Sequence, residues 1–419
     1  MKNIVFLIAL LSITCILGCG KKSSDDAPYV ANGITLDVPE VAGRNVVVKW
    51  TKTGKADLAM CQLYRRTDSV NGGWMGVMID VNAGQYIDTL STLPYVQYYM
   101  VTVSKKTQTE VQSNGVTYVR NDIDLISILP KDALFDRDGR VLYVYSGDGD
   151  ILAYDIATRK TLKKVSTGCE TGFCALGAYN GKKELYVARK DGWVFVYDAA
   201  TLTQTAQLNI GIDVYSVQYA NGKLFVSHYV NPNTLEVFDR ATMAKIWGES
   251  DVDLLRMIAV PGTNTQMLCA SAASTRMYRY LFNSVGLLVN KQMVTSETYG
   301  ATPEAFELFP DGNRIITSQQ GTILNANMGY VSALPRGSMA FSSFDFGNTA
   351  GQIYAGCRIR AVQAYAISDY QLVKTTATIG YPVKVFYDNG SVICISTLND
   401  PQFYYPADGP QAFVERVSE

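Results

Sequence analysis

The sequence contains a single histidine, His228, and its charges almost cancel, with 37 basic and 38 acidic residues and a net charge of −1. A Ser-His-Asp hydrolase would need His228 as its base, yet the sequence has no Gly-x-Ser-x-Gly elbow to carry the serine. The Gly-x-x-x-x-Gly-Lys-[Ser/Thr] loop that binds phosphates is also missing. Balanced charge leaves no electrostatic footprint for nucleic acid. We therefore expect neither a cofactor nor a nucleic-acid partner, and the sequence shows no catalytic set.

Long apolar runs are missing too, except near the N-terminus. Lys2 precedes an apolar stretch, residues 4–16, that has the length of a signal peptide and is too short to span a bilayer. The stretch leads into Leu17-Gly18-Cys19, which resembles the lipobox of bacterial lipoproteins. The resemblance implies that a signal peptide, residues 1–18, is removed and that Cys19 is lipidated. The alternative is an ordinary secretory signal in which Cys19 has no role.

The residues that follow Cys19 are polar. Residues 19–29 have the composition of a solvated tether, and the charged run 21–26 resembles the surface-export signal of some Gram-negative lipoproteins. Several acyl chains on one cysteine make a stable membrane anchor. We therefore expect a cell-envelope protein that is lipid-anchored to the outer membrane and exposed at the cell surface.

Short alternating strands are expected over residues 30–120. Val46 to Trp50, Cys61 to Arg66 and Tyr98 to Val103 each alternate apolar and polar residues, which is typical of an antiparallel sandwich. Together with Trp50, the pattern resembles a fibronectin type III domain. That resemblance implies an Ig-like β-sandwich that spaces or orients another domain. Cys61 has no partner cysteine nearby and is expected to be a buried free thiol.

A repeat organises residues 121–419. Three copies begin at Leu142, Leu185 and Leu224, which are 43 and 39 residues apart, and each has two apolar strands joined by a polar turn. Four weaker copies follow, beginning at Met267, Ile315, Ile353 and Val392. A repeat of about forty residues made only of short strands is typical of a β-propeller blade, and seven copies predict seven blades.

The second strand of each clear copy ends in an aromatic-Asp pair, at Asp155, Asp198 and Asp239. These acids are expected to shape the next turn by bonding to the backbone two residues on. The Tyr-Asp-x-Ala-Thr pattern resembles the YVTN and quinoprotein-like seven-bladed propellers, and the Gly-His and Trp-Asp pairs of WD40 repeats are missing. The predicted fold is all-β, a sandwich followed by a seven-bladed propeller. Two segments could close the ring, residues 124–129 or residues 412–417.

Two cysteines lie between the first and second copies of the repeat. In an oxidising compartment Cys169 and Cys174 could form a disulfide across their short loop. No second cysteine pair or histidine cluster accompanies them, so no metal site is expected. Cys269, Cys357 and Cys394 fall within strands and are predicted to be core residues.

The loops at one face of the ring are the remaining candidate site. Aromatic and Arg side chains suit a polar ligand, because Tyr faces stack on sugars and Arg binds carboxylates or phosphates. The candidate ligand-binding residues are Arg189, Tyr215, His228, Tyr229, Arg256, Arg276, Glu304, Arg358 and Lys384. The alternative for each is an ordinary polar rim residue.

The sequence favours a non-enzymatic binding or adhesion module over an enzyme. Its propeller head would bind an extracellular glycan or a protein partner, and its lipid would bind the membrane. The alternative is a lactonase-type hydrolase, because 6-phosphogluconolactonase-like proteins have similar propellers. No catalytic motif of that family is present to carry over.

Overall fold

A computed structural model describes most of the chain beyond its N-terminal region. The described residues are 33–42, 45–52, 58–66, 74–89, 95–105, 107–229, 232, 234–250, 252–262, 265–272, 274–295, 302–317, 320–347, 351–398, 400 and 412–418. The expected signal peptide, the lipidated Cys19 and the whole tether, residues 19–29, lie outside these residues. Within the described ranges, no helix has the length and apolar character needed to cross a membrane.

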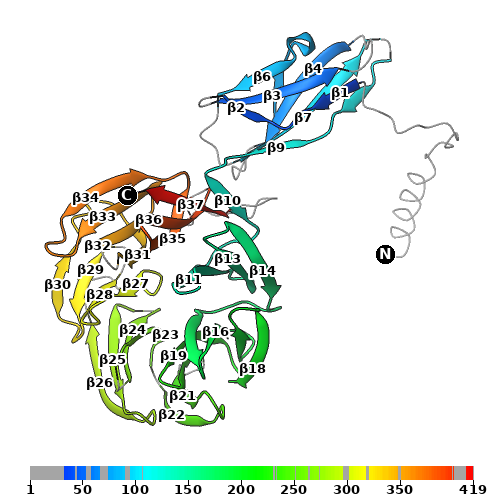
Figure 1. Ribbon diagram of the computed structural model, residues 1–419. Helices are drawn as coiled ribbons and strands as arrows, with labels where there is room; N and C mark the ends of the chain where they lie inside the picture. Colours follow the sequence, from blue (N-terminus) through cyan, green and yellow to red (C-terminus); the bar gives the residue numbers. More distant parts are fainter. Residues whose placement is uncertain are drawn as a thin grey trace, which may run out of the picture. The chain divides into compact units, whose positions relative to one another are not determined.

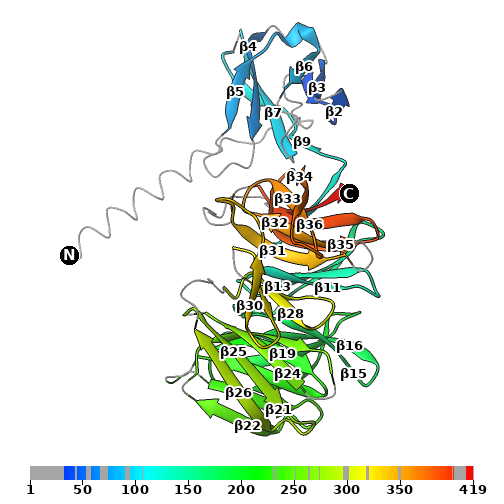
Figure 2. The same cartoon turned by 90° about the vertical axis from the view of Figure 1, so that its left-hand side faces the viewer.

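The described residues form two compact units, whose border in the chain lies between Tyr118 and Val119. The N-terminal unit has two antiparallel sheets and a short 3-10 helix, η2 (Val81–Ala83). One sheet contains β1 (Ile34–Leu36), β2 (Glu40–Ala42), β3 (Asn45–Lys52) and β6 (Gln85–Asp88). The other contains β4 (Leu58–Arg66), β5 (Met75–Met78), β7 (Tyr95–Ser104), β8 (Glu110–Gln112) and β9 (Val116–Val119). Figure 2 shows the two sheets, with β4, β5 and β7 in one and β2, β3 and β6 in the other.

The two sheets of the N-terminal unit share a polar contact as well as apolar side chains. The Tyr98 hydroxyl on β7 donates to Asp88 Oδ2 on β6, at 2.8 Å, and Arg65 Nη1 on β4 donates to Asp88 Oδ1 at 2.9 Å. Trp50 and Cys61 are both buried, and Cys61 is a free thiol, as expected. Asp88 is thus a buried carboxylate with two partners on the opposite sheet, which fixes how the sheets face each other.

The C-terminal unit consists, in its described part, of seven four-stranded antiparallel sheets. Figure 1 shows them arranged around a common axis, with one edge strand of each near the axis and the other on the outside. The first three sheets, from the inner strand outwards, are β11 (Asp132–Asp136), β12 (Val141–Tyr145), β13 (Asp150–Asp155) and β14 (Lys160–Ser166); β15 (Ala175–Tyr179), β16 (Lys182–Ala188), β17 (Trp193–Asp198) and β18 (Thr203–Asn209); and β19 (Val214–Ala220), β20 (Lys223–His228), β21 (Thr234–Asp239) and β22 (Lys245–Ser250).

Three further sheets follow the same order along the chain. They are β23 (Leu255–Val260), β24 (Thr265–Ser271), β25 (Arg276–Phe282) and β26 (Leu288–Thr295); β27 (Phe306–Leu308), β28 (Arg314–Thr317), β29 (Thr322–Asn325) and β30 (Tyr330–Ala333); and β31 (Phe341–Phe346), β32 (Gln352–Cys357), β33 (Ala361–Ala366) and β34 (Leu372–Ala377). The seven repeat copies seen in the sequence each supply the second strand of one sheet, from Leu142 in β12 to Val392 in β36.

The last sheet joins the two ends of the unit. Its strands, from the axis outwards, are β35 (Tyr381–Asp388), β36 (Ser391–Thr397), β37 (Ala412–Ser418) and β10 (Ile123–Ile126). Both segments proposed from the sequence therefore close the ring, because the C-terminal strand pairs with β36 and the N-terminal strand pairs with the C-terminal one.

Turn chemistry explains why the repeat folds in this way. Asp155 Oδ1 accepts a hydrogen bond from Ala157 N at 2.7 Å, and Asp239 Oδ1 accepts one from Ala241 N at 3.0 Å. Each of these hydrogen bonds joins the Asp carboxylate to the backbone N–H two residues further along the chain, which confirms the structural role predicted for the repeated Asp. Asn180, Asn221 and Asn389 are each followed by Gly and have the positive φ that tight Asn-Gly hairpin turns require.

Apolar side chains fill the space between neighbouring sheets. Tyr143 on β12 packs with Leu185 and Val187 on β16, and its hydroxyl donates to Ala199 O at 2.9 Å. The predicted core cysteines of the later repeats, Cys269, Cys357 and Cys394, are fully buried free thiols. Packing between sheets holds the inner strands in place, and those strands carry the site described next.

Candidate functional site

A cavity of about 300 Å³ follows the axis between the inner strands. Residues from all seven inner strands line it, together with Phe173 and Cys174 from the connection before β15. They are Ala133, Leu134, Phe135, Arg137, Phe173, Cys174, Ala175, Leu176, Ser216, Val217, Gln218, Arg256, Met257, Ile258, Glu307, Asp345, Lys384 and Phe386. We call this space the axial cavity.

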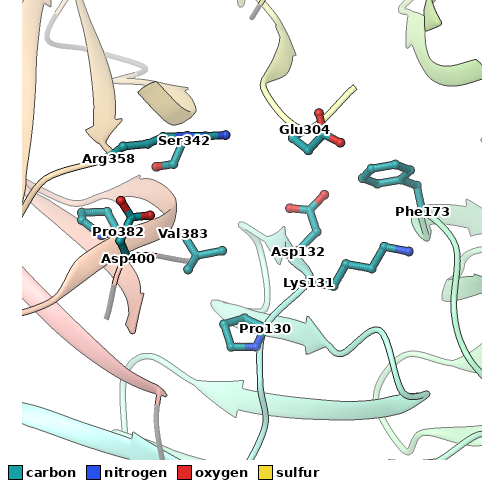
Figure 3. A pocket seen from close by; sticks show the side chains of 10 residues that line it. All are labelled: Pro130, Lys131, Asp132, Phe173, Glu304, Ser342, Arg358, Pro382, Val383 and Asp400. Carbon is teal, nitrogen blue, oxygen red and sulfur yellow. The ribbon is translucent and has the colours of Figure 1, made fainter. Parts of the chain in front are cut away.

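A second cavity of about 310 Å³ lies at the end of the axis where the inner strands begin, and we call it the mouth pocket. Figure 3 shows its lining side chains around a common space. They are Pro130, Lys131, Asp132, Phe173, Glu304, Ser342, Arg358, Pro382, Val383 and Asp400. These residues come from five of the seven sheets or the connections before or after their strands, so the pocket exists only when the ring is assembled.

A buried charge network separates the mouth pocket from the axial cavity. Asp132 Oδ2 accepts a hydrogen bond from Arg256 Nη2 at 2.9 Å, and Asp132 Oδ1 lies 3.3 Å from Lys384 Nζ. Lys384 Nζ also donates to Glu307 Oε1 at 2.6 Å. Two acids and two bases from β11, β23, β27 and β35 thus neutralise one another across the axis. We call this set of four residues the axial charge network.

Burial and charge act in opposite directions on these groups. Burial alone would raise the pKa of Asp132, but Lys384 and Arg256 beside it outweigh burial and hold that pKa below its usual value. Burial would likewise lower the pKa of Lys384, yet Asp132 and Glu307 raise it overall. Asp132, Arg256 and Lys384 are therefore charged at neutral pH, and none of the three is poised to exchange a proton there.

An aromatic side chain, Phe173, forms the wall shared by both cavities. Lys131 Nζ lies 5.2 Å from its ring centroid, and the Arg256 guanidinium carbon lies 4.5 Å away. Tyr215 packs edge-on against it, with 5.5 Å between ring centroids. Lys131 and Arg256 therefore both lie over the Phe173 ring, and the cation–π interaction stabilises both side chains.

Backbone bonds hold Phe173 in this place. Phe173 N donates to Tyr215 O at 2.8 Å, and Val217 N donates to Phe173 O at 3.0 Å, so the segment before β15 pairs with β19 of the next sheet. Gly172 allows the close approach, because a Cβ there would lie 2.2 Å from Tyr215 O.

Bulges aim side chains at the mouth end of three inner strands. The pairing register shifts between Val214 and Ser216, between Phe341 and Ser343, and between Pro382 and Lys384. The residues left out of the ladder are Tyr215, Ser342 and Val383. A bulge redirects the side chain of the extra residue, and bulges are frequent next to functional sites. Two of the three line the mouth pocket, and Tyr215 supports Phe173 from behind.

The opposite end of the axial cavity carries a different ion pair. Arg137 Nη2 donates to Asp345 Oδ1 at 2.6 Å, and Arg137 Nη1 donates to Tyr387 O at 2.8 Å. Burial raises the pKa of Asp345 despite Arg137. This contact ties β31 and β35 to the residue after β11.

Five of the nine residues predicted to bind a ligand lie at the mouth pocket or directly behind it. Glu304 and Arg358 line the pocket. Arg256 and Lys384 belong to the axial charge network, and Tyr215 packs on Phe173. The prediction thus placed these five residues at one face of the ring, and two of the five are structural charges that are already paired.

The other four predicted residues make their contacts within their own sheets or the adjoining loops and do not line the mouth pocket. Arg189 Nε donates to Asp191 Oδ1 at 2.9 Å, and its guanidinium lies over Phe195. Arg276 lies 3.6 Å from Asp253. Tyr229 is exposed, and its backbone N donates to the carbonyl of Asp213.

The fourth of them, His228, was expected in a loop, which is a wrong prediction. It is the last residue of β20 and is 5% exposed, with Nε2 3.2 Å from Glu236 Oε2 on the adjacent strand. The β20–β21 hairpin extends one residue further than its sequence suggested, because Thr234 pairs with His228.

The predicted disulfide is also wrong in this structure, since Cys169 and Cys174 are both free. Cys174 is buried in the apolar cluster that contains Tyr143 and Tyr145, and burial raises its pKa to about 12. Cys169 is only partly buried, and its carbonyl accepts a bond from the Thr167 hydroxyl. The chain between the two cysteines pairs with neighbouring sheets instead of forming a closed loop.

Sequence reasoning missed Lys131, Asp132 and Phe173. Asp132 holds the first position of β11, just as Arg256 and Lys384 lie near the starts of β23 and β35. An alignment of the inner strands from the seven repeats would have placed the acid Asp132 near the level of the bases Arg256 and Lys384. Phe173 lies outside the repeat pattern, and nothing in its sequence context marks it.

Comparisons with known proteins identify the fold of the C-terminal unit. The chain is similar to the β-propeller domain of Cps50 (Swd1) from Myceliophteria thermophila, with a TM-score of 0.54 and 10% identity over 72% of this chain and 100% of that one. It is also similar to the WD40 repeats of RRP9, with a TM-score of 0.55 and 8% identity over 71% of this chain and 98% of that one.

The fold is a β-propeller. A third structure, U3-55K, agrees, with a TM-score of 0.53 and 8% identity over 71% of this chain and 98% of that one. At such identities the likeness shows the propeller fold alone. No family model matches the sequence. A search of curated proteins finds no match either.

Proposed function

We propose that this chain is a non-enzymatic binding protein of the cell envelope, with the propeller as its binding head. The seven sheets would be the blades of a seven-bladed propeller similar to the YVTN and quinoprotein-like kind. The N-terminal unit would be a fibronectin type III-like spacer, which its two facing antiparallel sheets support. Cys19 would carry the lipid that anchors the chain to the outer membrane.

The mouth pocket is the observation that carries this proposal. Its acidic and basic residues include two, Arg358 and Glu304, whose charged groups have no hydrogen bond or ion pair among the residues that the structure describes. By contrast, the axial charge network beneath is fully paired and rigid. A preformed concave site with uncommitted charges on a rigid base is what a small-ligand or recognition site requires.

An extracellular glycan is the proposed ligand, with a protein partner as the alternative. The pocket is concave and, at about 310 Å³, lies at the lower end of the usual range of ligand pockets. A space of this size takes one terminal unit of a larger ligand. A protein partner would instead insert a single side chain and cover the surrounding rim.

The test is a glycan array probed with the full-length chain in detergent and with its Glu304→Gln variant. Binding that falls in Glu304→Gln but not in Arg276→Gln, whose arginine pairs with Asp253 away from the pocket, supports a pocket-centred binding head. Turnover of simple lactones that Glu304→Gln abolishes would contradict the non-enzymatic proposal. A blank array with no lactone turnover would contradict the glycan ligand and leave the protein partner.

A further inference from the structure

We infer that the ligand unit held in the mouth pocket carries a carboxylate, and that Arg358 together with Ser342 binds it. The ligand class is an acidic sugar of one-ring size, such as a uronic acid at the end of a glycan. This inference rests on the proposed function and specifies its substrate class.

Arg358 is a cation that has no counter-ion among the residues that the structure describes. It follows β32 directly, and its backbone N donates to Ala340 O at 2.8 Å, which anchors the residue to the connection before β31. Its side chain lines the mouth pocket and makes no hydrogen bond or ion pair with the described residues. A guanidinium held in this way has its planar donor edge available for a carboxylate, which it binds with two parallel hydrogen bonds.

Ser342 supplies a second uncommitted donor beside it. Its Oγ is buried and has no hydrogen-bond partner in the described part of the chain. The bulge in β31 releases Ser342 from the ladder, and the residue lines the pocket with its Oγ turned towards Gly356. Phe341 pairs with Cys357, which places Ser342 and Arg358 beside the same rung of the β31–β32 ladder. Both side chains line the pocket (Figure 3). A buried hydroxyl without a partner is costly, and a rotation of the Ser342 side chain towards an anionic oxygen held by Arg358 would satisfy it.

The charges on the other walls favour a ligand with one negative charge over one with two. Lys131 is the base among them, and its Nζ donates to the Thr171 carbonyl. Glu304 faces the pocket with an exposed carboxylate, and Asp400 also lines it. Asp132 is already neutralised by Arg256 and Lys384. These acids repel a doubly charged phosphate more strongly than a single carboxylate on a hydroxylated ring, so the carboxylate is favoured. The hydroxyls of such a ring can donate to Glu304, which accepts hydrogen bonds only.

The size and the apolar part of the pocket agree with one sugar ring. Pro382, Val383 and Phe173 provide apolar surface between the charged walls, and more of the pocket surface is apolar than polar. A pyranose has apolar faces and a polar edge, so it fits a site with apolar floor and polar ends. An oligosaccharide would have only its terminal unit inside.

Direct binding measurements with matched probes test the inference. The full-length chain in detergent is titrated, by calorimetry, with a uronic acid-terminated disaccharide, with the methyl ester of the same disaccharide, and with a free amino acid. We expect the acid to bind at least about 10-fold more tightly than its neutral ester, because charge-assisted bonds to Arg358 are lost in the ester.

Variants separate the carboxylate contact from the rest of the pocket. Arg358→Gln should weaken binding of the acid about 10- to 100-fold and leave binding of the ester unchanged. Ser342→Ala should give a smaller loss in the same direction, Arg358→Lys an intermediate loss, and the control Arg276→Gln none. Equal unfolding midpoints for all variants show that the ring is intact.

The possible results distinguish this inference from the proposed function. Equal binding of acid and ester, or an Arg358→Gln variant that binds the acid normally, overturns the inference and leaves a glycan-binding head. Preference for the amino acid over both sugars overturns the sugar class. No binding of any saccharide, on this titration or on the array, overturns the glycan ligand itself.

Discussion

Arg256 and Asp132 form an ion pair across the centre of the propeller, with 2.9 Å between Nη2 and Oδ2 and with side chains that are only 11% and 6% exposed. The two residues are 124 positions apart in the sequence and belong to the inner strands of different sheets. Their contact connects opposite parts of the ring beneath the mouth pocket.

Substitution of Asp132 by Ala should be strongly destabilising. The change leaves Arg256 and Lys384 buried with one carboxylate fewer between them, and breaking a buried pair in this way costs about 3–5 kcal/mol. Urea unfolding followed by circular dichroism measures the loss. Asp138→Ala is the matched control, because Asp138 is 91% exposed and pairs only with Lys183, so it should cost no more than about 1 kcal/mol. Similar losses for the two variants would contradict the central role of the network.

The same carboxylate should make the stability depend on pH on the acid side. The pKa of Asp132 is lower in the folded than in the unfolded chain, so its contribution is complete above the unfolded value near 3.8 and is lost as the pH falls through the folded value. Burial raises the pKa of Glu415, which therefore acts in the opposite direction. The informative quantity is the difference in unfolding free energy between the native chain and Asp132→Asn. It should stay constant down to about pH 5 and then shrink as the pH falls through the folded value, and a constant difference over that lower range would show that Asp132 is not responsible.

Gly172 should not tolerate a side chain. A Cβ at this position would lie 2.2 Å from Tyr215 O and 2.5 Å from Val214 O, so Gly172→Ala must push the segment that carries Phe173 away from β19. We expect a loss of about 1–3 kcal/mol in urea unfolding together with weaker ligand binding. Gly147→Ala is the control, because a Cβ there would have no neighbour within 4 Å. Equal stability of the two variants would contradict this account of Gly172.

Cys169 and Cys174 should remain free thiols in the purified protein. Alkylation after unfolding without a reductant should therefore modify both, as read by peptide mass spectrometry. In the folded protein Cys174 should resist alkylation, because burial raises its pKa to about 12 and keeps it from the reagent. A peptide pair linked through these two cysteines would contradict the structure and restore the disulfide expected from sequence.

The lipid anchor can be tested apart from the propeller. Cys19→Ala removes the proposed acylation site, so the variant should leave the detergent phase and appear in the aqueous phase after Triton X-114 partitioning. Mass spectrometry of the native protein should show a mature chain that begins with an acylated Cys19. Unchanged partitioning of Cys19→Ala would contradict the lipoprotein proposal.

The repeat made most of the propeller predictable from sequence. The second strand of each sheet was predicted from the sequence. Leu142 and its counterparts begin an apolar run that is followed by turn residues, and these runs recur at nearly regular intervals. The role of Asp155 was correct because its hydrogen bonds are local. The choice between two closing strands stayed open, since pairing between residues so far apart leaves no local pattern.

The candidate site was less predictable, because its chemistry depends on what faces each residue. Arg256 looks the same in sequence as Arg358, yet the first is buried against Asp132 and the second has no partner among the described residues. Cys169 and Cys174 are close in sequence, but backbone pairing of Phe173 with the next sheet gives the intervening chain another course. Spacing along the chain says little about such contacts across the ring.

The closing sheet forms only when strands from both ends of the propeller unit are present, because β37 pairs with β10 as well as with β36. The outermost strand, β10, is synthesised first in this unit, and its partner β37 is made last. A translation product that stops before Ala412 would leave β36 and β10 as open strand edges, which attract aggregation and proteases. Only a chain that includes β37 can bury both edges, so molecules without β37 should be degraded or aggregate rather than present an incomplete binding head.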